Sequence, residues 1–171
     1  PGHGRSEGDA LGDMAAMADW LARFMDAASV ETACVAGHSM GSLIAIEATA
    51  RHPDRVRALG LVGTAAVMPV HPDLIAAAEA GGVLAPNLIT DWGFGPDAHM
   101  GGHPSPGLWV SRAGFRVLAN GRHGSLAAGL KACNAYTGAV EAAARITCPT
   151  RLILGAEDRM TPVKAARPLI D

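Results

Sequence analysis

The sequence predicts an α/β protein in which a mostly parallel sheet is flanked by helices and interrupted by a helical insertion. Two apolar runs without polar alternation, at 30–36 and 56–62, have the pattern of strands that are buried on both faces. A helical pattern at 39–51 lies between them, and a right-handed crossover of this kind makes the two strands parallel neighbours. A third strand of the same sheet is expected at 150–155.

The helices around these strands follow from periodicity and from proline. An amphipathic helix is predicted over 10–28, because apolar side chains recur there at three- and four-residue steps. The helix at 39–51 ends before Pro53, which cannot continue it. A last helix begins near Pro162, since proline is favoured in the first helical turn.

The segment between residues 68 and 144 breaks the alternation of strands and helices. Prolines and glycines are frequent in it, and Ala-rich helical pieces are predicted at 73–80 and 124–144. We interpret this segment as a helical cap over the sheet. The predicted segments are therefore a first core segment, a cap and a second core segment, which comprise residues 1–67, 68–144 and 145–171.

Composition and charge exclude several classes of protein. The 171 residues are 49% apolar and 18% charged, which predicts a compact domain with a sizeable core. The net charge is −2 and no basic run is present, so a nucleic-acid partner is not expected. No apolar stretch approaches the ~20 residues that a membrane span requires. The three cysteines lack paired spacing, which favours a reducing cytoplasm.

We expect neither a metal nor a cofactor. His99 and His103 have the four-residue spacing of a helical metal pair, but the glycines and the proline around His103 disfavour a helix there. The stretch from Gly93 to Ala98 matches a dinucleotide-binding pattern by letter, but no strand precedes it and Pro96 lies within it.

The motif that indicates chemistry is Gly37-His38-Ser39-Met40-Gly41, between a predicted strand and a predicted helix. A serine nucleophile at the top of a sheet requires a sharp turn with positive φ, and the flanking glycines give strand and helix room to approach. The Met40 N–H would face the oxyanion that forms when Ser39 attacks an acyl carbon. The alternative is a turn whose serine only caps the helix, although a cap has no need of both glycines.

With this motif the chain resembles the α/β-hydrolase family over nearly its whole length. The resemblance implies that Ser39 is the nucleophile and that Asp158 is the acid, because family triads run in the order Ser, Asp or Glu, His. Glu157 is the neighbouring rival of Asp158, and a turn aspartate that caps the next helix is the alternative. Four segments match the family in order: Pro1 to Ser6, the nucleophile elbow, Arg51 to Val56, and Leu154 to Asp158.

The resemblance also implies a general-base histidine after Asp158, whereas all seven histidines precede it. We therefore expect an internal piece of a larger hydrolase that lacks the first strands and the C-terminal histidine. This piece is expected to be inactive alone, because serine without a base is a poor nucleophile. His38 is expected to pack beneath the top edge of the sheet and not to act as the base.

The aromatic residues of the insertion bear on the substrate. Trp92, Phe94 and Trp109, together with His38, would line a pocket for a small apolar acyl or ester substrate, and the alternative is that they form the core of the cap. We predict a carboxylic ester hydrolase that forms an acyl-enzyme. A non-catalytic binding domain, a cofactor-independent peroxidase and a C–C bond hydrolase remain alternatives. Exposed sheet edges predict self-association.

Overall fold

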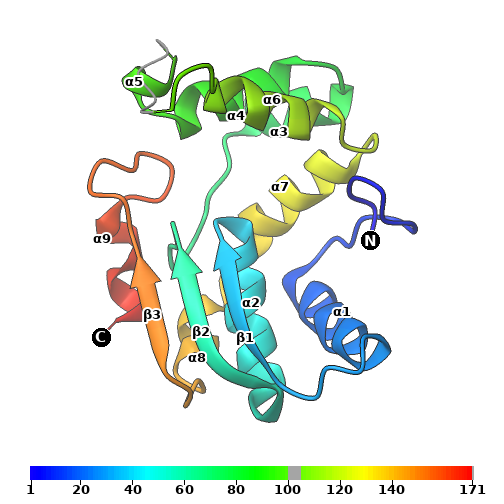
Figure 1. Ribbon diagram of the computed structural model, residues 1–171, viewed down its shortest axis with the longest axis vertical. Coiled ribbons are helices and arrows are strands. Elements are labelled where there is room, and N and C mark those ends of the chain that lie inside the picture. The colour runs from blue at the N-terminus through cyan, green and yellow to red at the C-terminus, as the bar shows by residue number, and fades with distance from the viewer. Residues whose placement is uncertain (100–104, 171) are drawn as a thin grey trace. The chain divides into compact units, whose positions relative to one another are not determined.

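The computed structural model describes residues 1–99 and 105–170. These residues form two compact units, and we describe each by itself. The sheet unit comprises 12–69 and 132–171, and the helical unit comprises 1–11 and 70–131. The elements, as labelled in Figure 1, are α1 (Met14–Ala27), β1 (Ala33–His38), α2 (Met40–Arg51), η1 (Pro53–Arg55), β2 (Val56–Val62), α3 (Pro72–Ala80), α4 (Leu84–Gly93), α5 (Pro96–His99), α6 (Val110–Ala119), α7 (Ser125–Ala135), α8 (Ala139–Ala143), β3 (Thr150–Ile153), α9 (Val163–Ala166) and η2 (Arg167–Leu169).

The sheet consists of three parallel strands in the order β1-β2-β3 (Figure 1). Gly37 lies opposite Leu61, and Leu59 lies opposite Thr150. The predicted parallel sheet flanked by helices is therefore confirmed. Because all three strands run the same way, the residues that follow them gather at one edge of the sheet, where open α/β sheets place their ligands.

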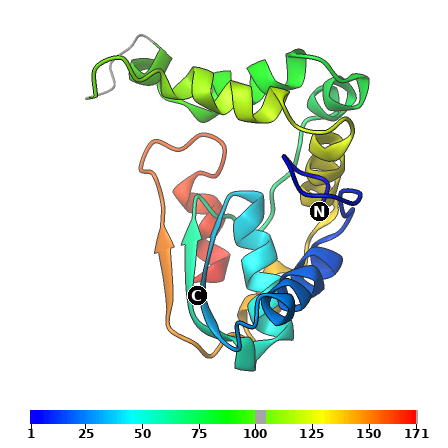
Figure 2. The same cartoon turned by 45° about the vertical axis from the view of Figure 1, so that its right-hand side comes forward.

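One face of the sheet packs against helices. Leu59 and Leu61 of β2 join Ile46 of α2 and Ala142 of α8 in one buried cluster. Figure 1 shows α2 and α8 behind the strands, and Figures 1 and 2 both show α1 beside α2. Residues 132–144, which we predicted as the end of the cap, accordingly belong with the sheet unit, because α8 packs on α2.

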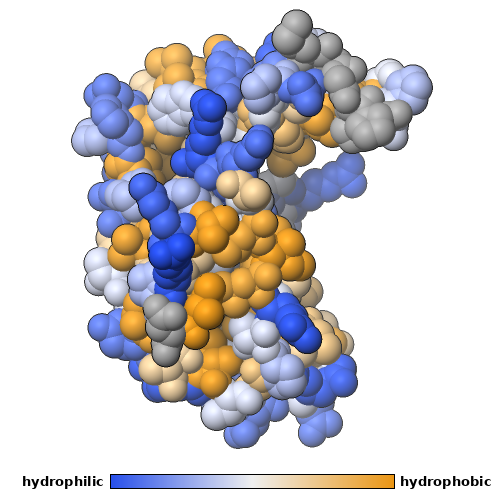
Figure 3. All heavy atoms as spheres, turned by 90° about the vertical axis from the view of Figure 1, so that its left-hand side faces the viewer, coloured by the Kyte–Doolittle hydropathy of each residue, from blue (hydrophilic) through white to orange (hydrophobic). Residues whose placement is uncertain are grey.

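The prediction of burial on both faces is wrong for β1, and the third strand, β3, is also partly exposed. Cys34 and Ala36 are exposed on β1, and Ile153 on β3 is 61% exposed. Figure 3 shows an extended apolar surface on the side of the molecule that carries β3 and α9. A strand without polar alternation has apolar side chains on both of its faces. The pattern does not show whether other residues of the same chain cover those faces.

Helix α1 begins later than predicted, at Met14, because Asp13 caps it by accepting a hydrogen bond from the Ala16 amide at 2.8 Å. Its buried side chains lie toward α2. A polar link joins the same two helices: Arg51 binds both carboxylate oxygens of Asp19, at 2.9 and 2.8 Å, and His52 Nε2 lies 2.8 Å from Asp19 Oδ1.

The helical unit contains helices that the sequence analysis did not predict. Both α4 and α6 lie in the stretch that we interpreted as rich in breakers. Pro86 is the third residue of α4, where a missing amide costs no helical hydrogen bond, and Gly93 ends that helix. The single piece predicted at 124–144 is two helices, α7 and α8, with Tyr136 to Gly138 between them. The core of this unit includes Leu74, Ala78, Ala85 and Ala127.

Candidate active site

Ser39 is the single residue between the end of β1 and the start of α2. Its φ of 52° and ψ of −123° lie where residues with a side chain are rarely found. The positive φ that we predicted for this turn is present. Such a conformation costs roughly 1–3 kcal/mol and persists only where the surroundings hold it. One such contact is the hydrogen bond that the Ser39 amide donates to the Val62 carbonyl at 3.0 Å, which ties the turn to the end of β2.

The two glycines of the motif are not equivalent. A Cβ on Gly37 would overlap the backbone of the helix, with the Ser42 nitrogen only 2.7 Å away. A Cβ on Gly41 would meet nothing within 4 Å. The close approach of strand and helix therefore requires glycine at position 37, and the expectation that Gly41 provides room in the same way is corrected.

The Ser39 side chain does not cap α2. Its hydroxyl makes no capping hydrogen bond, which contradicts the alternative of a serine that serves only as a helix cap. Its carbonyl oxygen instead accepts from the Ser42 amide at 2.8 Å. Met40 is the first residue of α2, where an amide has no acceptor within its own helix.

A buried pair of hydroxyls, which the sequence analysis did not predict, supports this turn. The Ser42 hydroxyl is hydrogen-bonded to the Ser39 carbonyl oxygen at 2.6 Å and to Thr64 Oγ1 at 2.8 Å. Both Ser42 and Thr64 are completely buried. Thr64 follows β2 by two residues, so the pair links the start of α2 to the chain that leaves the central strand.

Asp158 lies in the turn that follows β3, and its carboxylate is held by three donors. Oδ1 accepts from the amides of Met160 at 2.8 Å and Thr161 at 2.9 Å, and Oδ2 accepts from the Thr161 hydroxyl at 2.8 Å. The following helix, α9, has Pro162 as its N-cap and no side-chain cap, so Asp158 does not cap it. Glu157, the rival carboxylate, is exposed.

These donors keep the Asp158 carboxyl ionised. Burial raises the pKa of this carboxyl. The hydrogen bonds from the backbone and hydroxyl of Thr161 and from the Met160 amide lower it by more, and the charge of His38 also lowers it. The pKa of Asp158 is therefore below its usual value. A carboxylate that is ionised at neutral pH suits a residue that orients and stabilises an imidazolium.

Ser39 and Asp158 both follow the carboxyl ends of parallel strands, with the end of β2 between them. Gly63 occupies this middle position: its amide donates to the Ile153 carbonyl at 2.9 Å. A Cβ on Gly63 would lie 3.3 Å from the Thr161 hydroxyl and 3.5 Å from the His38 ring. His38 is exposed, so the expectation that it packs beneath the edge of the sheet is wrong.

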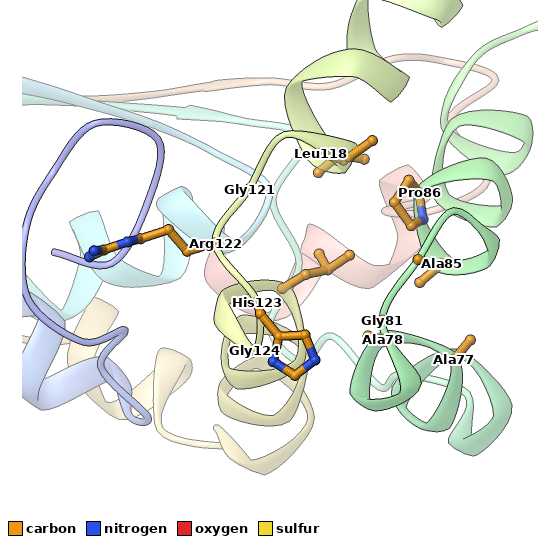
Figure 4. Close-up of a pocket in the computed structure, with 13 residues that line it drawn as sticks. Ala77, Ala78, Gly81, Ala85, Pro86, Leu118, Gly121, Arg122, His123 and Gly124 are labelled. Atoms are coloured by element: carbon orange, nitrogen blue, oxygen red, sulfur yellow. The ribbon is translucent and has the colours of Figure 1, made fainter.

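The other predicted pocket residues belong to the helical unit. Trp92 and Trp109 are 47% and 55% exposed, and Phe94 packs against Gly114 of α6. None of them lines the small cavity that this unit contains, of about 160 Å³, shown in Figure 4. The cavity has mostly small or apolar walls, with the ring of His123 beside Gly81. The role of the aromatic residues in a substrate pocket stays a prediction.

The buried thiol of Cys133 is a weak nucleophile. Burial raises the pKa of the Cys133 thiol to about 11, so it stays protonated at neutral pH and is no rival to Ser39. His99 Nε2 lies 3.1 Å from the Phe94 carbonyl oxygen, and His103 lies outside the described residues. Across residues 1–99 and 105–170, no three histidine, cysteine or carboxylate side chains converge as a metal site requires.

Every helix in the described part of the chain is too short or too polar to cross a lipid bilayer.

Comparison with known proteins agrees with this architecture. A family model described as alpha/beta hydrolase fold matches residues 1–92. The pimeloyl-[acyl-carrier protein] methyl ester esterase of Chromobacterium violaceum is 32% identical, over 98% of this chain and 66% of its own length. The monoacylglycerol lipase of Mycolicibacterium smegmatis is 33% identical, over 80% of this chain and 48% of its own length.

Solved structures show the same fold. The enol-lactonase from Burkholderia xenovorans LB400 superposes with a TM-score of 0.86 at 24% identity, over 98% of this chain and 64% of that protein. The 171 residues therefore span no more than about two thirds of the proteins that they match.

Proposed function

This chain belongs to the alpha/beta hydrolase fold family, and from that premise we propose that it carries the nucleophile and the acid of a serine hydrolase that cleaves carboxylic esters. Ser39 is the proposed nucleophile and Asp158 the proposed acid. The observation that carries the proposal is the uncapped Ser39 in a positive-φ turn, at the edge of the sheet where the ionised Asp158 also lies.

The proposed reaction has two halves. The Ser39 oxygen attacks the ester carbonyl carbon, its proton passes to an imidazole, and the Met40 amide donates to the negative oxygen of the tetrahedral intermediate. Collapse of the intermediate expels the alcohol, which takes that proton, and leaves an acyl group on Ser39. Water then attacks the acyl-enzyme by the same steps and releases the acid. Asp158 orients the imidazole and stabilises its positive charge.

The imidazole is the part of the triad that these 171 residues do not supply in the usual chain order, since no histidine follows Asp158. We therefore propose that residues 1–171 alone hydrolyse esters poorly. Loss of one triad member typically costs ~10⁴ in rate.

The substrate class is proposed from chemistry and from relatives. A serine nucleophile with an oxyanion donor acts on acyl groups. The two curated relatives described above carry the names of an ester hydrolase and a lipase. A carboxylic ester with a small apolar acyl or alcohol group is the class that fits both arguments.

The test is ester hydrolysis by residues 1–171 and by a version extended by its native flanking sequence, each compared with its Ser39→Ala variant. We expect a short-chain aryl ester to be hydrolysed by the extended version only, and Ser39→Ala to abolish that activity. The His38→Gln variant separates the two possible bases, because it removes the imidazole next to Ser39, and hydrolysis by the extended version that survives this change excludes His38 as the base.

Three outcomes would contradict parts of this proposal. Enzyme-like hydrolysis by residues 1–171 that His38→Gln abolishes would identify His38 as the base. No hydrolysis of esters by either version would favour a domain that binds a ligand without catalysis. Activity on peroxide or carbon–carbon substrates alone would place the chain among those alternatives.

A further inference from the structure

Thr161 makes two contacts with one carboxylate. Its amide donates to Asp158 Oδ1 at 2.9 Å, and its hydroxyl donates to Asp158 Oδ2 at 2.8 Å. A residue that holds both oxygens prevents rotation of the carboxylate plane, since any rotation lengthens one of the two bonds. Met160 binds only Oδ1, through its amide, and cannot impose this restraint by itself.

The hydroxyl of Thr161 is itself held in place. The residue is only 5% exposed, and its amide is fixed by the turn. Gly63, with a φ of +54°, lies beside it at the end of β2, and a Cβ there would lie 3.3 Å from the Thr161 hydroxyl. The Thr161 hydroxyl therefore lies in the space that Gly63 leaves open, between the central strand β2 and the turn that carries Asp158.

We propose that Thr161 is a positioning residue that fixes the orientation of the Asp158 carboxylate toward the site of the imidazole, an inference that rests on the proposed role of Asp158. Hydrogen bonds to a carboxylate are stronger than those between neutral groups, and the side-chain bond adds an orientation that the two backbone donors leave free. Oδ1 accepts two amide hydrogen bonds and Oδ2 accepts one hydrogen bond, so Oδ2 keeps the acceptor capacity that a histidine N–H would use. Second-layer contacts of this kind set the geometry of functional groups.

The first test measures Asp158 directly and requires no catalysis. The carboxyl carbon of Asp158 is followed by NMR during a pH titration of residues 1–171 as wild type, Thr161→Val and Thr161→Ser. We expect Thr161→Val, which is nearly isosteric but lacks the hydroxyl, to raise the pKa of Asp158, and Thr161→Ser to keep the wild-type value. Thr150→Val is the matched control: its hydroxyl binds the Cys148 carbonyl at the opposite end of β3, and its loss should leave Asp158 unchanged.

The second test measures ester hydrolysis by the extended version described under Proposed function. Thr161→Val should lower kcat about tenfold, the loss expected of a hydrogen bond to a charged group, with little change in KM, and Thr161→Ser should restore the rate. If Thr161→Val does not fold, Thr161→Ala provides the same comparison.

An Asp158 titration that is identical in the wild type and in Thr161→Val would overturn the proposal, as would an equal loss of kcat in Thr161→Val and Thr161→Ser. A raised Asp158 pKa in Thr161→Val, together with ester hydrolysis that survives Ser39→Ala, would show that the positioning holds while the proposed function fails.

Discussion

At the scale of single residues, the groups around Ser39 differ in how well the structure would tolerate their substitution. Gly37 faces the backbone of α2, where even one carbon does not fit, whereas Gly41 faces open space. Ser42 and Thr64 are completely buried and hydrogen-bonded to each other, so each satisfies a polar group that would otherwise be costly to bury. The strained turn is therefore supported from the strand side and from the helix side.

The first prediction compares the two glycines of the turn. Gly37→Ala should destabilise the protein by about 3 kcal/mol or more, because strand and helix must separate to admit the added carbon. Gly41→Ala should be neutral or stabilising by roughly 0.5–1 kcal/mol, because alanine is favoured over glycine in a helix. Urea denaturation of both variants measures the difference. Equal losses of stability would show that the close approach at Gly37 is not the reason for glycine there.

At the scale of elements, α1 and α2 are joined by apolar packing and by the ionic contacts of Asp19. Hydrogen bonds from Arg51 and then from His52 lower the pKa of Asp19 from its ordinary value of 3.8 to about 2. The Asp19 side chain is 31% exposed, so solvent screens these contacts. They contribute to stability only while Asp19 is ionised.

The second prediction concerns the pH dependence of this link. Because the folded pKa of Asp19 lies below its unfolded value, the stabilisation is fully present above about pH 5 and is lost as the pH falls toward 2. Asp19→Asn should therefore lower the free energy of unfolding at neutral pH and converge with the wild type in acid. Urea denaturation across this pH range tests the point, with Asp54→Asn on the exposed η1 turn as the control. A constant difference at all pH values would contradict it.

At the scale of the whole molecule, the sheet unit leaves apolar surface exposed. Ile153 on the edge strand β3 is 61% exposed, and exposed apolar side chains follow it in the acid turn and the C-terminal helices. Figure 3 shows this side of the molecule as a broad apolar surface. An edge strand with unpaired backbone groups beside apolar side chains is a common site of association.

The third prediction is that residues 1–171 associate with themselves through this surface. Sedimentation velocity should show a mass that rises with protein concentration, and Ile153→Lys should reduce that rise, because a charge on an edge strand opposes pairing. Val117→Lys provides the control, since Val117 is 75% exposed on α6 of the helical unit. A concentration-independent monomer would exclude self-association, and an equal effect of the two substitutions would exclude β3 as the contact.

Local sequence patterns predict the order of strand, sharp turn and helix around Ser39 and the carboxylate that follows the third strand. Both features depend on residues that are neighbours in the sequence: apolar runs indicate the strands, and glycine spacing and turn residues indicate the turns. The parallel sheet followed from the same local patterns, because a strand, a helix and a strand within some thirty residues allow few arrangements.

The side chains that support these groups are visible only in the folded structure. Ser42 meets Thr64, 22 residues away, and Gly63 meets Thr161, yet no local pattern pairs them. The difference between Gly37 and Gly41 and the exposure of His38 belong to the same class. Each depends on the packing of atoms distant in the chain, and periodicity and propensity carry no information about those contacts.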